Sequence, residues 1–127
     1  DGLNLSYIPN PDVSYLAKQG VLMLNASLSV EINKAGSHLD VWEPFIKYLF
    51  EEVLNYLGVP IVFLGKDAAK YKKYTGIFAH VFEVSHPASA SYKGIDWDTE
   101  GVFTKVNRLL EENNGFSVMW LDIDAPF

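Results

Sequence analysis

Three short apolar runs, each bounded by glycine or polar residues, alternate along the chain with segments of helical periodicity. The runs cover residues 21–25, 60–65 and 78–84. Short continuous apolar runs are typical of buried strands in a parallel sheet, whose strands need helical crossovers between them. The order of the elements therefore predicts an α/β fold in three layers, with a short central parallel sheet and helices on both of its faces.

The segments between these runs carry helix signals. From Asp40 onward, apolar side chains recur at steps of three and four residues, and Glu43 completes a capping box with Asp40. Gly58 is placed to end this helix. We expect a short helix at 67–74 and a last helix at 99–112, which an Asn-Asn-Gly stretch ends.

Composition agrees with one compact domain over residues 1–127. The chain is 49% hydrophobic and 14% aromatic, which is enough for one sizeable core. No apolar run approaches the ~20 residues of a membrane span, so we expect no membrane partner. The absence of cysteine excludes disulfides and thiolate metal sites, and the three histidines are dispersed. We therefore expect no metal and no cofactor.

The distribution of charge leaves two interpretations open. A net charge of -6 opposes binding to phosphates, which favour lysine and arginine. However, four lysines cluster in one short segment, namely Lys66, Lys70, Lys72 and Lys73. A solvated helix face and a surface that grips a few phosphates both fit this cluster.

Polar residues end one of the apolar runs and follow another. Asn25 closes the first run, and His86 comes two residues after the third. Because the carboxyl ends of parallel strands meet at one edge of a sheet, the two side chains could face one pocket. An amide donates and accepts hydrogen bonds, and an imidazole can donate to a developing negative charge. The structural alternatives are an Asn that caps a strand end and a His satisfied by neighbouring backbone.

Five segments, in this order, resemble the family-1 uracil-DNA glycosylases. They are residues 16–30 around Asn25; Gly36-Ser37-His38 with Trp42-Glu43-Pro44-Phe45; residues 61–65 with Ala68-Ala69-Lys70; His86-Pro87 with Ser91 and Gly94; and Phe103-Thr104-Lys105-Val106-Asn107. Each segment is weak alone, but their common order is specific. The resemblance implies the α/β fold of that family and hydrolysis of the N-glycosidic bond of uracil in DNA.

The resemblance also implies roles for individual residues. His86 would donate, as a neutral imidazole, to the departing base, and His38 would orient a phosphate or the catalytic water. Asn25 would recognise uracil, with Leu5 and Ser6 also contacting the substrate. The residues expected to contact DNA are Ser89, Ala90, Ser91, Tyr92 and Lys66.

The chain departs from the family pattern at three positions. Leu5 stands where the family has a Phe that stacks on uracil, and Ala88 stands where it has a Ser. Ala90 replaces a Leu that wedges into the duplex as the nucleotide leaves the stack. A methyl group fills that space poorly, so we expect weaker base flipping from duplex DNA, unless Tyr92 inserts instead.

The family's water-activating motif would lie immediately before Asp1. It is a Gly-Gln-Asp-Pro-Tyr stretch that carries the catalytic Asp, and the interval from Ser6 to Leu16 is also shorter than in the family. We therefore expect the domain to be incomplete at its N-terminus. Asp67 and Asp96 are the other carboxylates that we consider for this role.

The resemblance implies single-stranded or duplex DNA containing uracil as the partner of a monomeric protein, with a proteinaceous glycosylase inhibitor as a further partner. The expected location is the cytoplasm or wherever the DNA lies. Two alternatives remain open. One is a non-catalytic nucleic-acid-binding relative of the same fold, and the other is an unrelated small α/β domain with a nucleotide pocket.

Overall fold

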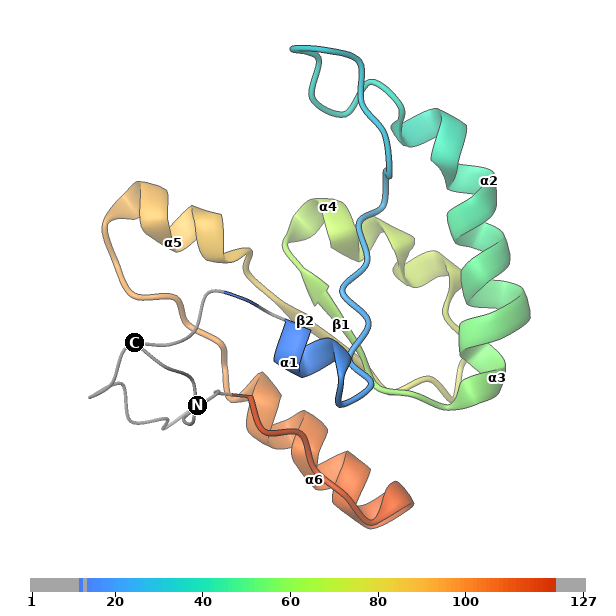
Figure 1. The fold of residues 1–127 in the computed structure, drawn as a ribbon, viewed down its shortest axis with the longest axis vertical. Helices are drawn as coiled ribbons and strands as arrows, with labels where there is room; N and C mark the ends of the chain where they lie inside the picture. Colours follow the sequence, from blue (N-terminus) through green and yellow to red (C-terminus); the bar gives the residue numbers. More distant parts are fainter. Residues whose placement is uncertain (1–11, 13, 121–127) are drawn as a thin grey trace. The chain divides into compact units, whose positions relative to one another are not determined.

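The computed structural model describes Asp12 and residues 14–120 (Figure 1). The chain divides into two compact units. The terminal unit comprises Asp1–Leu24 and Thr99–Phe127, and the central unit comprises Asn25–Asp98. Among the described residues, no helix combines the length and the apolar character that a membrane crossing requires.

The central unit contains one long helical stretch, two strands and two shorter helical segments. In chain order the elements are α2 (Leu39–Leu49), a π-helical turn η1 (Phe50–Leu54), α3 (Asn55–Leu57), β1 (Ile61–Leu64), α4 (Lys66–Ala69), a 3-10 turn η2 (Lys70–Tyr74), β2 (Val81–Val84) and α5 (Pro87–Lys93). Gly58 adopts a φ of +65° directly after α3, in the left-handed region that glycine favours. The long helix ended by Gly58 and the short helix at 67–74 are therefore confirmed.

The two strands β1 and β2 pair in parallel, and Figure 1 shows them side by side. Ile61 pairs with Val81 at one end of the ladder, and Leu64 pairs with Val84 at the other. The helical segments α4 and η2 lie in the connection between the strands, as a parallel pair requires. The α/β class and the parallel arrangement predicted from the sequence are confirmed.

The core of the central unit forms where the long helix packs on the sheet. Ile46, Phe50 and Phe63 are buried together, and the rings of Phe50 and Phe63 stack with centroids 5.9 Å apart. Burial of such side chains contributes about 1.5–3 kcal/mol each. Partly buried side chains surround them, namely Leu54, Ile61, Ala68, Ala69, Tyr71, Tyr74 and Val81.

The predicted capping box at the start of α2 is wrong. His38 is the N-cap residue and makes no capping hydrogen bond with its side chain, and Asp40 lies inside the first turn. Glu43 instead accepts a hydrogen bond of 2.6 Å from the Tyr74 hydroxyl and forms an ion pair of 3.3 Å with Lys73. The Tyr74 bond and the Lys73 ammonium lower the pKa of the Glu43 carboxyl. Glu43 therefore ties α2 to η2.

The strand predicted at 21–25 is also wrong. These residues adopt no regular secondary structure, and the side chains of Leu22 and Met23 are 66% and 59% exposed. A strand forms only when a neighbouring strand offers free N–H and C=O groups. In the described part of the chain the ladder contains β1 and β2 alone, so this apolar run has no partner.

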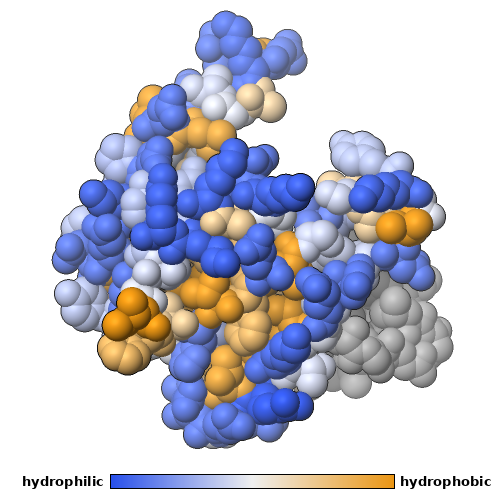
Figure 2. Space-filling model, turned by 180° about the vertical axis from the view of Figure 1, so that it is seen from behind, coloured by the Kyte–Doolittle hydropathy of each residue, from blue (hydrophilic) through white to orange (hydrophobic). Residues whose placement is uncertain are grey.

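The third predicted strand begins later than expected. Residues 78–84 were expected to form it, but β2 starts at Val81. Ile77 and Phe78 lie in a turn, with 92% and 89% of their surface exposed. Apolar side chains reach the surface in this way on the face drawn in Figure 2, where orange atoms lie among blue ones. An apolar run therefore marks where a strand is possible, but the ladder sets its limits.

The terminal unit contains α1 (Ser14–Ala17) and α6 (Val102–Asn114). Val102 and Val106 are the buried residues of α6, and Gly115 ends the helix with a φ of +75°. The last helix, predicted at 99–112, is confirmed with its limits shifted by two to three residues.

Side-chain amides hold the segment after α6. Asn107 donates to the Val118 carbonyl at 2.9 Å and accepts from the Val118 N–H at 2.8 Å. Gln19 makes the same pair of bonds with Met119, at 3.0 and 2.8 Å. The two amides thus satisfy backbone groups that a neighbouring strand would otherwise satisfy.

Replacing Asn107 with Leu should lower the free energy of unfolding by about 1–3 kcal/mol, because it leaves two backbone groups of the buried Val118 without partners. Asn113→Leu, at an exposed position of the same helix, is the matched control and should change it by less than about 0.5 kcal/mol. Urea unfolding measures both variants. Equal effects of the two substitutions would contradict a stabilising role for the two Asn107–Val118 hydrogen bonds.

Candidate active site at the ends of the two strands

The chain after β1 lies directly against His86. Gly65 donates its N–H to the Val84 carbonyl at 2.8 Å, which continues the pairing of the strands by one residue. Gly65 has a φ of +91°, and a Cβ atom built on it would lie 3.1 Å from the Cβ of His86. Only glycine fits this position without displacing a neighbour. The structure therefore brings together the ends of β1 and β2, whereas the sequence predicted that His86 would share this edge with Asn25, whose apolar run forms no strand.

His86 lies at the N-terminus of α5 with its imidazole ring oriented by the backbone. Its Nδ1 atom accepts a hydrogen bond of 3.0 Å from the N–H of Ala88. An accepting Nδ1 carries no proton, so the neutral ring holds its proton on Nε2. His86 is exposed, and this tautomer makes Nε2–H a donor to a group that approaches from outside.

The segment after His86 is a helix that the sequence reading missed. Pro87 occupies its first turn, and Gly94 follows its last residue with a φ of +66°. Proline at the start and glycine after the end are helix signals, so the pattern was present in the sequence. The helix determines which side chains of this segment face the solvent.

Ala90 does not reach the surface, contrary to the prediction that it contacts DNA. Its side chain is buried, with 7% of its surface exposed, because α5 turns it inward. Tyr92 is 91% exposed on the same helix. Ser89 and Ser91 are exposed as well. The described surface of α5 therefore offers two hydroxyl groups, one aromatic ring and the ammonium group of Lys93.

His38 is half-buried and is held by a short polar chain. The Nε1–H of Trp42 donates to the Ser29 hydroxyl at 2.7 Å, and that oxygen lies 2.9 Å from Nδ1 of His38. An indole N–H only donates, so the Ser29 oxygen accepts from Trp42, while the tautomer of His38 sets the direction of the Ser29–His38 bond. With Nδ1 engaged in this way, Nε2 of His38 is the ring atom that remains for a ligand.

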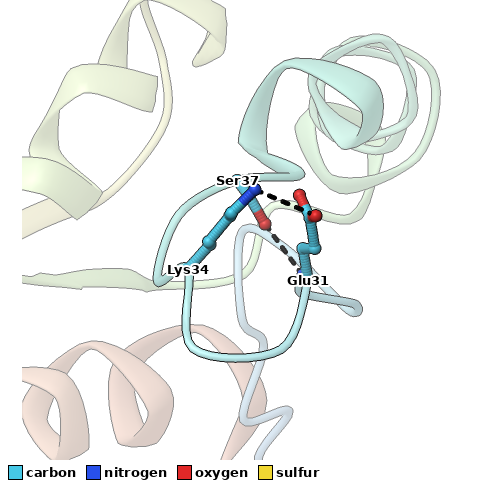
Figure 3. Close-up of polar contacts among 3 residues, drawn as sticks. All are labelled: Glu31, Lys34 and Ser37. Atoms are coloured by element: carbon cyan, nitrogen blue, oxygen red, sulfur yellow. Dashed lines mark hydrogen bonds and ion pairs between the residues drawn. The ribbon is translucent and has the colours of Figure 1, made fainter.

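The loop before His38 is closed by its own side chains (Figure 3). Lys34 and Glu31 form an ion pair of 3.1 Å, and the Glu31 N–H donates to the Ser37 hydroxyl at 2.8 Å. Both bonds join residues of the same turn. Ser37, part of the Gly-Ser-His motif, therefore makes a structural contact within the loop. His38 follows it directly as the N-cap residue of α2.

Asn25 is exposed and lies where the two units of the chain divide. Within the residues that the structure describes, the hydrogen bonds of His38 and His86 lead to Ser29 and Ala88 and do not join either ring to Asn25. The predicted substrate contacts Leu5 and Ser6 lie outside the described residues. In the same part of the chain, no group of three or more His, Asp or Glu side chains could hold a metal ion.

The lysine cluster on α4 and η2 is largely neutralised. Ion pairs of 3.1–3.3 Å join Lys70 to Asp67, Lys72 to Glu83 and Lys73 to Glu43. These contacts favour the interpretation of a solvated helix face for three of the four lysines. Lys66 is exposed, takes part in none of these pairs and is the residue directly after Gly65.

Comparison with known proteins places these residues in a family. Residues 7–111 match the Uracil DNA glycosylase superfamily, and the chain belongs to that superfamily. It is 38% identical over 115 residues to the uracil-DNA glycosylase of Streptococcus pyogenes serotype M49 (strain NZ131), covering 87% of this chain and 52% of the relative. It is also 38% identical over 121 residues to that of Pseudomonas aeruginosa (strain UCBPP-PA14), covering 89% and 51%. The chain thus spans about half the length of the curated relatives it matches.

Gly65→Ala should displace His86 and also cost about 1–3 kcal/mol of stability, because it adds both a short contact and a strained backbone. Gly20→Ala is the matched control, since Gly20 has a φ of +89° but no atom within 4 Å of the added Cβ. Imidazole NMR signals of His86 should shift in the first variant and stay unchanged in the second. Unchanged signals in both would contradict the close packing of Gly65 on His86.

Proposed function

We propose that this chain forms the part of a uracil-DNA glycosylase that recognises uracil and stabilises the departing base. The observation that carries the proposal is the tautomer of His86, whose Nδ1 accepts from Ala88 and leaves Nε2–H as a donor at the ends of the strands. The match to the superfamily and relatives named uracil-DNA glycosylase support it. The match runs through both units, which supports treating residues 1–127 as one domain.

The chemistry needs the kind of donor that His86 supplies. Hydrolysis breaks the bond between C1′ of deoxyribose and N1 of uracil, and the bonding electron pair leaves with the base. Negative charge then develops on an exocyclic oxygen of uracil, while the sugar carbon becomes positive until the oxygen of water bonds to it. A hydrogen bond from a neutral imidazole to that oxygen stabilises the departing base in the transition state.

A carboxylate must also stabilise the positive sugar and position the water. Asp67 forms an ion pair with Lys70, and the described contacts of His86 do not lead to Asp96. In the resembling family the carboxylate comes from the water-activating motif, and we assign the same source in the whole protein. The 127-residue chain alone should accordingly bind DNA and release no uracil.

Asn25 is the proposed recognition residue. Its amide can accept from N3–H of uracil while donating to O4, whereas cytosine presents the opposite pattern of donor and acceptor. Discrimination arises because the wrong base leaves the donor and acceptor groups of the amide and of the base unpaired in the complex. Its exposed position leaves the amide accessible to a base.

In the whole protein, Asn25→Asp should narrow the preference for uracil over cytosine by tenfold or more, because a carboxylate has no N–H to donate to O4 of uracil and can accept from the amino group of cytosine. Asn113→Asp, at an exposed position of α6, is the control and should leave the preference unchanged. Excision rates on oligonucleotides that carry either base give the ratio. An unchanged ratio with retained activity would assign Asn25 a structural role.

The surface of α5 is the proposed contact with the DNA strand. Tyr92 presents an exposed ring, and Ser89 and Ser91 present hydroxyl groups for phosphates. Lys66, directly after Gly65, supplies a positive charge near His86. Because Ala90 is buried, Tyr92 is the side chain that fills the stack when a nucleotide leaves it.

Tyr92→Ala should reduce kcat/KM on duplex DNA by about 5- to 100-fold, the equivalent of about 1–3 kcal/mol of base stacking. The rate on single-stranded DNA should change little, because a wedge acts only where there is a stack to hold open. Tyr56→Ala, at another exposed tyrosine, is the control. Equal losses on both substrates would show that Tyr92 is no wedge.

The alternative is a relative of the same fold that binds nucleic acid without cleaving it. The excision assay separates the two, since that alternative predicts that the whole protein binds uracil-containing DNA and releases no base. The superfamily relatives that match this chain are named as glycosylases, and this favours the enzyme.

A further inference from the structure

We propose that Trp97 is a positioning residue for His86. Its indole Nε1–H donates to the backbone carbonyl of Ser85 at 2.8 Å, across 12 positions of sequence. The bond connects the loop after α5 to the residue that immediately precedes His86. This inference rests on the role given to His86 in the proposed function.

The contact acts on His86 through the geometry of the peptide bond. The carbonyl of Ser85 and the N–H of His86 belong to one planar group, so a bond that fixes the carbonyl fixes the plane from which His86 begins. Gly65 lies close to the same peptide group, since a Cβ atom built on it would lie 3.7 Å from the backbone nitrogen of His86. The Ala88 N–H thus orients the ring of His86, and Gly65 lies against its Cβ and backbone nitrogen. Trp97 fixes the carbonyl of the residue before it.

The same bond closes the loop that carries α5. The chain leaves β2 at Ser85, forms α5, turns at Gly94 and returns to Ser85 through Trp97. The turn itself is fixed by backbone bonds from Gly94 to Ser91 and from Ile95 to Ala90. The Trp97 donor therefore contributes both to the orientation of the imidazole and to the placement of the α5 surface.

Tryptophan is the aromatic residue that can make this contact, because phenylalanine has no N–H and the tyrosine hydroxyl lies at the end of a longer ring axis. The indole of Trp97 is half-buried, and its replacement leaves the Ser85 carbonyl without this hydrogen bond. A loop that lacks this bond samples more positions, and small displacements of a donor reduce rates strongly.

The test compares Trp97→Phe with Trp120→Phe. Trp120 is the matched control, since its indole nitrogen is buried without a hydrogen-bond partner within the described residues. In the 15N-labelled 127-residue chain, long-range 1H–15N spectra should show the Nε2–H tautomer of His86 in wild type and in Trp120→Phe. The spectrum of His86→Gln assigns the signals. Trp97→Phe should give averaged nitrogen shifts, and unchanged His86 signals in a folded variant would overturn the inference.

Kinetics on a single-stranded uracil oligonucleotide separate this inference from the proposed function. In the whole protein, Trp97→Phe should lower kcat by about 10- to 100-fold and change KM less than about twofold, because the bond orients a group that acts in the transition state. A loss confined to KM would overturn the positioning role. If Trp97→Phe alters the His86 signals but the wild-type whole protein releases no uracil, the positioning role is supported and the proposed glycosylase activity is refuted.

If Trp97→Phe does not fold, hydrogen exchange in the wild-type chain tests the inference instead. The indole N–H of Trp97 should exchange with heavy water more slowly than that of a freely exposed indole, because it is bonded to the Ser85 carbonyl. Exchange at the rate of a free indole would overturn the inference.

Discussion

The close approach of Gly65 to His86 is the constraint on which the candidate site depends. The parallel ladder of β1 and β2 ends there, and the Gly65 N–H extends it to the Val84 carbonyl. A side chain at position 65 would push the two strand ends apart. The pairing that builds the sheet therefore also sets the position of the imidazole. The contact between Gly65 and His86 serves both the fold and the candidate site.

Much of the fold could be predicted from the periodicity of apolar residues and from the glycines that end helices. Gly58 ends a helix where the sequence placed its end, and β1 matches its apolar run within one residue. Gly115 ends α6 two residues beyond the predicted limit. These features are local, because a residue with left-handed backbone stops a helix wherever the helix packs. The run at 21–25 failed for the opposite reason. Its apolar pattern is equally clear, but a ladder depends on a second strand, which no local pattern supplies.

The candidate site was predictable in its residue types and less so in its contacts. His86 follows β2 as the motif indicated, but its tautomer depends on the N–H of Ala88, two residues further on in a helix that was not anticipated. The burial of Ala90 and the exposure of Tyr92 follow from the same helix. Glu43 satisfied a capping pattern yet contacts Tyr74, 31 positions away. Contacts between distant residues determine these roles, and sequence spacing does not record them.

The pairing of three lysines with acidic side chains has a consequence for how the protein would hold DNA. Each phosphate neutralised by a protein cation releases bound counterions, and this release makes affinity fall as salt concentration rises. Lysines already paired with Asp67, Glu83 and Glu43 are less available to neutralise a phosphate and so to release its counterions. Binding through Lys66, Lys93, the serine hydroxyls of α5 and the Tyr92 ring would therefore depend less on ionic strength than binding through the three paired lysines as well. Stacking and neutral hydrogen bonds, which survive in concentrated salt, would supply part of the affinity.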